Sequence, residues 1–150
     1  MIEGLILPDV EAEESAPFWA GCERGALLVQ RCGSCGRRRM PPRTMCPWCR
    51  SFDVEWQPMS GRAHVWSVVI PHPPLLPAYG EQAPYNVVIV TLDDDESIRF
   101  VGNVVADGGA PLNSIDPHDI AIGDAVEVVF GQVADDVWLP QWRPVAEPPR

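Results

Sequence analysis

The sequence predicts a mainly β protein in which a short N-terminal helix and a rubredoxin-like zinc ribbon precede a five-stranded barrel of the OB-fold (oligonucleotide/oligosaccharide-binding) type. Two observations support this fold class. Two Cys-x-x-Cys pairs lie ten residues apart, and five segments with the apolar pattern of β-strands follow Gly61. We expect an arm and helix over 1–25, the ribbon over 26–56, the OB-fold over 57–144 and a tail over 145–150.

The first predicted element is a helix of about two turns that begins after Ser15. Ser15 is a typical N-cap residue, Pro17 falls in the first turn, and Gly25 marks the end. So short a helix is not stable alone in water. Its side chains Phe18 and Trp19 therefore require a hydrophobic surface, supplied by the same domain or by a partner, and we expect them at a partner interface.

The cysteine pattern predicts a structural zinc site. Each Cys-x-x-Cys pair can fold as a tight knuckle that turns both sulfurs toward one point, and two knuckles supply the four thiolates that structural Zn²⁺ prefers. A closed four-sulfur shell leaves no position for water or substrate, so the ion would stabilise the fold without activating anything. The expected ligands are Cys32, Cys35, Cys46 and Cys49. The fifth cysteine, Cys22, is expected to pack as a small apolar side chain.

The ribbon is expected to contain a strand over 26–31 and a return segment over 37–43. Because Pro41 and Pro42 cannot donate ladder hydrogen bonds, the return strand must be short or lie at an edge. The barrel strands are expected at 62–70, 85–92, 98–105, 125–131 and 137–142. The turn over 116–124 is too short for a parallel crossover, so the sheet should be antiparallel. Closure into a barrel would remove its exposed edges, and a β-sandwich fragment is the alternative.

A proline-rich insertion over 71–85 separates the first two barrel strands. It contains five prolines and no regular apolar period, which predicts an extended, semi-rigid loop without helix or strand. Long loops in compact domains are usually functional or disordered. Its apolar side chains indicate either a docking surface or a loop that folds back on its own barrel; they are Leu75, Leu76 and Tyr79.

Charge is distributed unevenly along the 150 residues. The net charge is −10, yet the segment 24–50 carries seven arginines and no acid, while 51–150 carries four arginines and fifteen acids. A basic patch on an acidic body is implied. The return segment is where contacts to a phosphate-bearing ligand or an acidic partner would lie, unless it is a solvated positive face; its arginines are Arg37, Arg38, Arg39 and Arg43.

Several function classes find little support in the residues. No window of about 18 apolar residues and no secretory leader occurs, so we expect a cytoplasmic protein without membrane contact. The three histidines have no spacing typical of a triad or an open metal site, and the acidic run 93–96 reads as a solvated turn. Nucleic-acid binding is the rival function, because zinc ribbons and OB-folds both serve it, but the barrel is acidic.

The order of the motifs resembles the DUF35 family of zinc-ribbon and OB-fold proteins. The likeness runs from about Phe18 to Pro144 and rests on these segments: FWAGCERGALLVQRCGSCGRRRMPPRTMCPWC, SGRAHVWSVVI, APYNVVIVTLDD, IGDAVEVVF and LPQWRP. The resemblance implies an accessory subunit that pairs with thiolases, 3-hydroxy-3-methylglutaryl-CoA synthase, MaoC-type enoyl-CoA hydratases or thiolase-fold aldolases of steroid side-chain degradation. In that family the helix and ribbon bridge to the partner, and the OB-fold helps to shape a substrate or CoA channel.

We therefore expect a non-catalytic subunit of a hetero-oligomer that organises a thiolase-superfamily acyl-CoA enzyme, a thiolase or a retro-aldolase of lipid or steroid metabolism. The family's zinc ligands correspond to the four cysteines named above, and no catalytic residue carries over. A single-stranded nucleic-acid-binding protein is the alternative. The identity of the partner, its acyl substrate and the stoichiometry lie beyond the sequence.

Overall fold

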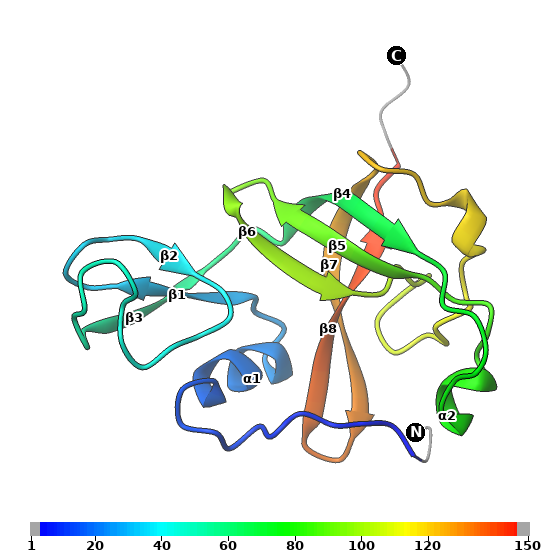
Figure 1. The fold of residues 1–150 in the computed structure, drawn as a ribbon, viewed down its shortest axis with the longest axis horizontal. Coiled ribbons are helices and arrows are strands. Elements are labelled where there is room, and N and C mark those ends of the chain that lie inside the picture. Colours follow the sequence, from blue (N-terminus) through cyan, green and yellow to red (C-terminus); the bar gives the residue numbers. More distant parts are fainter. Residues whose placement is uncertain (1–3, 147–150) are drawn as a thin grey trace.

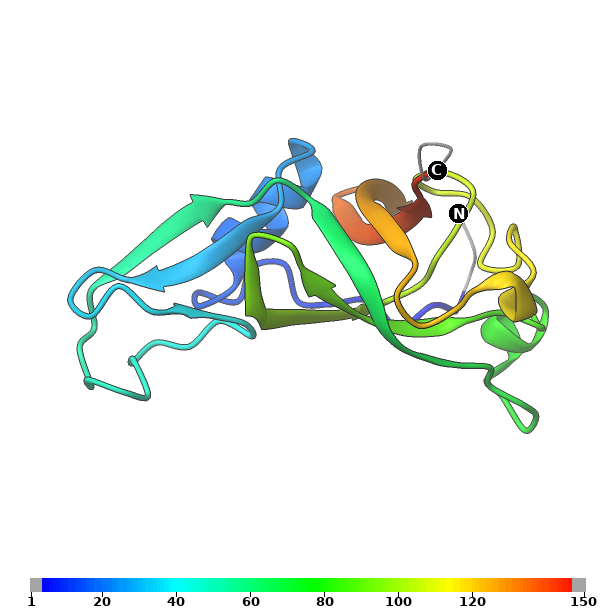
Figure 2. The ribbon, with the colours of Figure 1, turned by 90° about the horizontal axis from the view of Figure 1, so that it is seen from above.

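The computed structural model describes residues 4–146, so the first three residues of the predicted arm and the last four of the predicted tail lie outside it. The zinc ribbon forms one end of the molecule and the OB-fold the other (Figures 1 and 2). The ribbon is a three-stranded antiparallel sheet of order β2-β1-β3, with bounds Leu28–Cys32 (β1), Arg38–Arg39 (β2) and Val54–Pro58 (β3).

The return strand β2 is as short as the two prolines after it predict. The strand β3 was not predicted from the sequence. This third strand pairs with β1 along its whole length, from Leu28 opposite Pro58 to Cys32 opposite Val54. Its alternation is weak because its side chains are exposed or half-buried rather than divided between a core and a solvent face. The ribbon sheet is therefore held mainly by β1 and β3.

The second sheet has five strands in the order β6-β5-β4-β7-β8, and all its ladders are antiparallel. The strand bounds are Arg62–Val69 (β4), Val87–Leu92 (β5), Asp95–Gly102 (β6), Ala125–Ala134 (β7) and Val137–Pro144 (β8). Alternate residues of β4 and β5 are buried, as a half-buried strand requires. The predicted OB-fold is confirmed.

Closure of this barrel is incomplete between β6 and β8. Backbone pairing between these two segments occurs only past the end of β6. There Val104 and Trp142 form a single parallel bridge, and the Val105 N–H donates to the Trp142 carbonyl over 2.8 Å. Figure 1 shows β6, β5 and β4 in front and β7 and β8 behind them, with the helix α1 beside β8. The remaining gap needs a cover from outside the sheet.

The helix α1, Ala16–Glu23, supplies that cover. The Phe18 ring stacks on Phe100 of β6 with 6.0 Å between centroids, and Phe100 packs in turn against Trp142 at 6.2 Å. Phe18 is only 5% exposed. The hydrophobic surface that this side chain requires thus belongs to its own chain, which corrects the expectation that Phe18 faces a partner. Trp19 stays half-buried at the edge of the same core.

Two local expectations also need correction. The Ser15 hydroxyl does not cap the helix; its backbone carbonyl instead accepts from Phe18 and Trp19. The insertion 71–85 is not without helix, because one short turn, α2, spans Pro77–Gly80 with Pro at its first position, where its fixed φ favours a helix.

A 3₁₀ turn, η1, occupies Pro117–Asp119. No helix in the part of the chain described here is both long and apolar enough to cross a membrane.

Candidate metal centre and apolar groove

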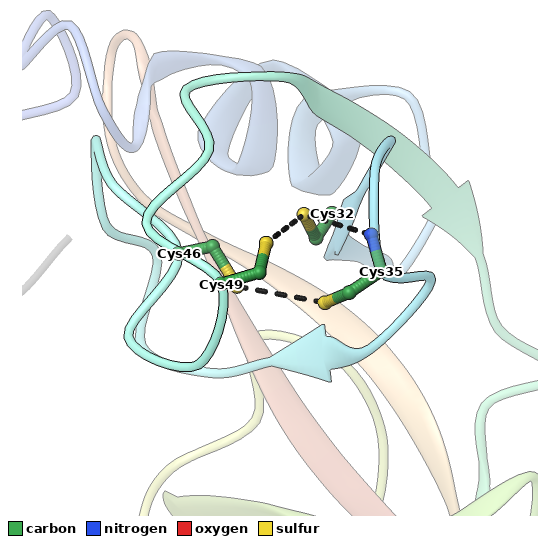
Figure 3. A group of neighbouring side chains, drawn as sticks. All are labelled: Cys32, Cys35, Cys46 and Cys49. Atoms are coloured by element: carbon green, nitrogen blue, oxygen red, sulfur yellow. Dashed lines mark hydrogen bonds between the residues drawn. The ribbon is translucent and has the colours of Figure 1, made fainter.

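The two knuckles bring four cysteine sulfurs to one point (Figure 3). All four Sγ atoms lie within 4.8 Å of one another; Cys32 and Cys49 are 3.6 Å apart, and Cys35 and Cys46 are 3.7 Å apart. Tetrahedral zinc with Zn–S bonds of about 2.3 Å requires sulfurs roughly 3.8 Å apart, so the donor set fits one ion. These four residues are the predicted ligands, and they are positioned to bind one metal.

Backbone geometry makes both knuckles. The residue after each Cys-x-x-Cys pair has a positive φ, 76° at Gly36 and 61° at Arg50, which turns the chain back over the sulfurs. Such a backbone suits glycine and is unfavourable for arginine. The Gly36 and Arg50 N–H groups donate to the carbonyls of Cys32 and Cys46, both over 2.9 Å. The second knuckle thus adopts the geometry of the first, although Arg50 takes an unfavourable left-handed backbone conformation.

Backbone donors also favour the thiolate form that a metal binds. The Cys35 N–H points at the Cys32 sulfur over 3.4 Å, and this contact is the main cause that lowers the pKa of Cys32 to about 6. The Cys49 N–H lowers the pKa of Cys46 in the same way. In contrast, burial raises the pKa of Cys22 to about 12, so this fully buried thiol stays protonated. Its predicted packing role agrees with this environment.

The arginines of the return segment divide into two kinds. Arg38 donates to Gln57 of β3 over 2.9 Å and pairs with Asp95 of β6 over 3.1 Å, so it ties the ribbon to the barrel. Arg39 is 4% exposed and donates to the Arg43 carbonyl under the ribbon loop. Arg38 is therefore engaged within the chain, whereas buried Arg39 keeps its Nε and Nη1 atoms without a hydrogen-bond partner among the described residues. A ligand or partner contact at these two residues stays a prediction. Arg37 and Arg43 are exposed.

The acidic turn after β5 is a junction rather than a solvated tip. The Asp94 carboxylate accepts from the Ser60 N–H and hydroxyl at 2.6 and 2.7 Å, and these bonds lower the pKa of Asp94. Burial by itself raises the pKa of Asp95, but hydrogen bonds from Ser97 and Arg38 hold that pKa below its usual value. Asp93 contacts His64 over 2.6 Å. Of these contacts, the pair between Arg38 and Asp95 joins the ribbon to the OB-fold, and the contact between Asp93 and His64 lies within the OB-fold.

An apolar groove of about 880 Å³ lies beside the incompletely closed side of the OB-fold. Its walls come from the N-terminal arm, α1, the ribbon loop, the insertion 71–85, β6 and the β7–β8 hairpin. The aliphatic and aromatic side chains that line it include Leu5, Ile6, Leu7, Phe18, Trp19, Met40, Tyr79, Tyr85, Val87, Phe100, Val101, Leu112, Val133 and Leu139. Local sequence patterns could not predict it, because these segments and the loop over 109–112, which also lines the groove, are far apart in the sequence.

Arg99 is the one charged side chain among the described residues that line the groove. Among the described residues that line it there is no Asp, Glu, His, Lys or Cys. Its amides hold the rim: Gln82 accepts from the Leu112 N–H and Gln141 from the Gly109 N–H. Burial raises the pKa of Tyr85, so its phenol stays protonated. Apart from Arg99, this mainly apolar lining fits an apolar ligand.

The contact residues predicted in the insertion 71–85 lie partly in this groove and partly outside it. Tyr79 lines it and its hydroxyl accepts from the Ile6 N–H over 3.4 Å, while Leu75 is half-buried and Leu76 is 54% exposed. The insertion 71–85 therefore folds back on its own barrel and leaves one leucine exposed. Of the histidines, His64 and His118 are exposed and contact Asp93 and Asp116, and His72 is exposed in the insertion.

The structure thus places this protein in the class that joins a four-cysteine zinc ribbon to an OB-fold, here with an apolar groove beside it. Two family models match the chain in the same order: the ChsH2 rubredoxin-like zinc ribbon domain over residues 19–55, and the ChsH2 C-terminal OB-fold domain over 56–131. A DUF35 domain-containing scaffold protein of Methanocaldococcus jannaschii is 33% identical over 76% of this chain and 74% of its own length. The chain belongs to the DUF35 family.

Two longer relatives are named as hydratase subunits. A probable enoyl-CoA hydratase alpha subunit of Thermomonospora curvata is 34% identical over 85% of this chain, and the 3-oxo-4,17-pregnadiene-20-carboxyl-CoA hydratase alpha subunit of Mycobacterium tuberculosis is 30% identical over 89%. This chain spans only 36% and 38% of their lengths.

Solved structures agree on the fold. A chain of the Ltp2-ChsH2(DUF35) aldolase superposes with a TM-score of 0.77 at 30% identity, covering 91% of this chain and 98% of the other. A DUF35 protein of unknown function from Sulfolobus solfataricus gives 0.58 at 15% identity, covering 89% and 87%, which supports the fold alone.

Proposed function

We propose that this chain is a non-catalytic accessory subunit that binds and organises a thiolase-superfamily acyl-CoA enzyme, a thiolase or a retro-aldolase of steroid or lipid side-chain degradation. The observation that carries the proposal is the apolar groove, which offers a binding surface without acid–base or nucleophilic groups among its described lining residues other than tyrosine and serine. The reacting groups would come from the partner. The similarity to a chain of an aldolase complex and the scaffold-protein relatives support this division.

In this proposal the groove forms part of the partner's acyl-CoA channel. Apolar walls would hold the acyl chain, so that its reacting atoms meet the partner's catalytic groups in a productive geometry. Arg43 directly follows Pro42 at the ribbon end of the groove, and together with exposed Arg37 it would face the CoA phosphates. Trp19 and Leu76 keep surface for partner contact. Zinc would hold the ribbon in shape and take no part in the reaction.

Complex formation is the direct test. The chain is co-expressed with the acyl-CoA enzyme encoded beside it, and the mixture is separated by size-exclusion chromatography with activity measured across the peaks. We expect one peak that contains both proteins and holds the activity. Two separate peaks, with the partner fully active by itself, would refute the proposal.

The groove has its own test. Ala110→Asp places a carboxylate in the lining, whereas Ala121→Asp places one on an exposed loop outside it. We expect the first variant to raise the KM of the complex for long-chain acyl-CoA about tenfold or more, because the apolar wall is lost. The second should leave it unchanged. Equal effects of the two variants would show that the groove does not hold the acyl chain.

A further inference from the structure

The outer face of strands β4, β5 and β6 is apolar where an antiparallel sheet with one buried face is usually polar. Val101 is 70% exposed, Val69 56% and Trp66 50%. Their neighbours on the inward face, such as Val90 and Val65, are buried in the core. The exposed positions are therefore not needed to stabilise the OB-fold, and contiguous exposed apolar residues of this kind mark an interaction surface.

Strand register shows that these side chains are contiguous. Val69 lies opposite Val87, and Ile89 lies opposite Val101 one strand further along. Arg99, two residues before Val101 on the same side of β6, places its guanidinium 4.0 Å from the centre of the Trp66 ring. We call these residues the outer patch; its members are Trp66, Val69, Val87, Ile89, Val101 and Arg99.

The charge of the outer patch is opposite to that of the whole chain. Arg99 and Arg62 both point outward, and within residues 4–146 neither guanidinium has a salt-bridge partner. Glu127, which lies opposite Arg62 on β7, pairs with Arg143, and Asp93 contacts His64. A cationic apolar face on a protein of net charge −10 complements an apolar surface that carries a carboxylate.

The outer patch also adjoins the groove. β6 is the edge strand of the sheet, and three patch residues line the groove as well: Val87, Arg99 and Val101. A protein seated on the patch would therefore cover one open side of the groove. Aromatic residues, arginine and aliphatic side chains together are typical of the central part of protein interfaces.

We propose that the outer patch is the surface on which the acyl-CoA enzyme docks, with a carboxylate of that enzyme opposite Arg99. The inference rests on the proposed function and deepens it, because docking there turns the groove toward the partner. A second copy of this chain would set two cationic faces against each other. A nucleic-acid strand would find one face of Trp66 already covered by Arg99, and an acidic barrel around it.

Paired variants of equal exposure test the assignment. Val101→Asp changes the centre of the patch, and Ile122→Asp changes a residue that is 71% exposed in the segment before β7. Affinity for the partner of the co-expression experiment is measured by isothermal titration calorimetry. We expect Val101→Asp to weaken binding tenfold or more, which is about 1.4 kcal/mol, and Ile122→Asp to stay within about twofold. Arg99→Gln should weaken binding and reduce its dependence on salt.

Hydrogen exchange of the wild-type complex provides a second readout that needs no variant. Amides in 87–102 should exchange more slowly in the complex than in the free chain, and those in 117–124 should not change. A complex that forms without this protection, or with the same affinity in Val101→Asp, overturns the docking surface but leaves the accessory function intact. Failure of the wild-type chain to bind the partner refutes both. Binding of a single-stranded 30-mer that Val101→Asp abolishes would assign the patch to nucleic acid instead.

Discussion

Among the described residues, one ion pair connects the ribbon to the OB-fold. Arg38 reaches from β2 to Asp95 on β6, and both side chains are about a quarter exposed. A partly exposed pair contributes only about 1 kcal/mol, but this one also receives support from Gln57 and Ser97. Its position, rather than its strength, matters most: it fixes the ribbon loop that forms one wall of the groove.

The pKa values of this junction predict how stability depends on pH. The pKa values of Asp94 and Asp95 lie below their ordinary range in the folded chain, so both carboxylates stabilise the fold above their unfolded pKa. This contribution disappears as the pH falls through the lower, folded values. We expect the free energy of unfolding to decrease below about pH 4.

Asp95→Asn should remove part of this dependence and cost about 1 kcal/mol at pH 7, measured by urea denaturation at several pH values. Asp136→Asn, in the exposed turn between β7 and β8, is the matched control and should behave like the wild type. If the two variants gave the same pH profile, the junction would carry no stability.

Among the elements, the short helix α1 contributes to the core of the OB-fold. It fills the gap between β6 and β8, and its residues Phe18 and Cys22 belong to the same core as Trp142. The OB-fold thus depends on a segment that precedes the ribbon in the chain. A two-turn helix is stable here because the barrel offers the hydrophobic surface that it needs.

Phe18→Ala should therefore destabilise the whole OB-fold by about 3–5 kcal/mol, because a large cavity opens in the core. Chemical denaturation followed by fluorescence measures this loss. Trp48→Ala changes an aromatic residue that is 50% exposed on the second knuckle and should cost less than about 1 kcal/mol. An equally small cost for Phe18→Ala would instead place this residue at a partner interface.

At the scale of the whole molecule, two sources of stability combine. One apolar core joins the OB-fold to its neighbours, because Phe18 of α1 and Val29 of β1 belong to the same cluster as Trp142. The ribbon relies in addition on a metal ion for free energy on the order of 10 kcal/mol. The pair between Arg38 and Asp95 also connects the ribbon to the barrel, and Ser60 bonds Asp94 beside it.

Cys46→Ser should accordingly release the zinc and unfold the ribbon while much of the β-sheet of the OB-fold remains. Atomic absorption measures the metal, and amide hydrogen exchange measures each part separately. Met45→Ser, at the neighbouring exposed position, should keep one zinc ion per chain. Loss of protection throughout 62–144 in Cys46→Ser would show that the barrel cannot fold without the ribbon.

The zinc ligands, the OB-fold strands and the short return strand of the ribbon could be predicted from the amino-acid sequence. Each depends on neighbours along the chain: the spacing of Cys32 and Cys35, the two-residue period of β4, or a proline that cannot donate a hydrogen bond. The family pattern added the order of these parts. The strand β3 was not predicted, because its exposed and half-buried side chains do not show the alternation that is typical of a strand.

Which side chains are exposed depends on tertiary contacts. Phe18 is a core residue because β6 and β8 separate beside it, Arg38 pairs with Asp95, and Arg39 is buried. The groove and the outer patch likewise arise from segments far apart in the sequence. Exposure is a property of such long-range contacts, and residue type and spacing alone do not encode it locally.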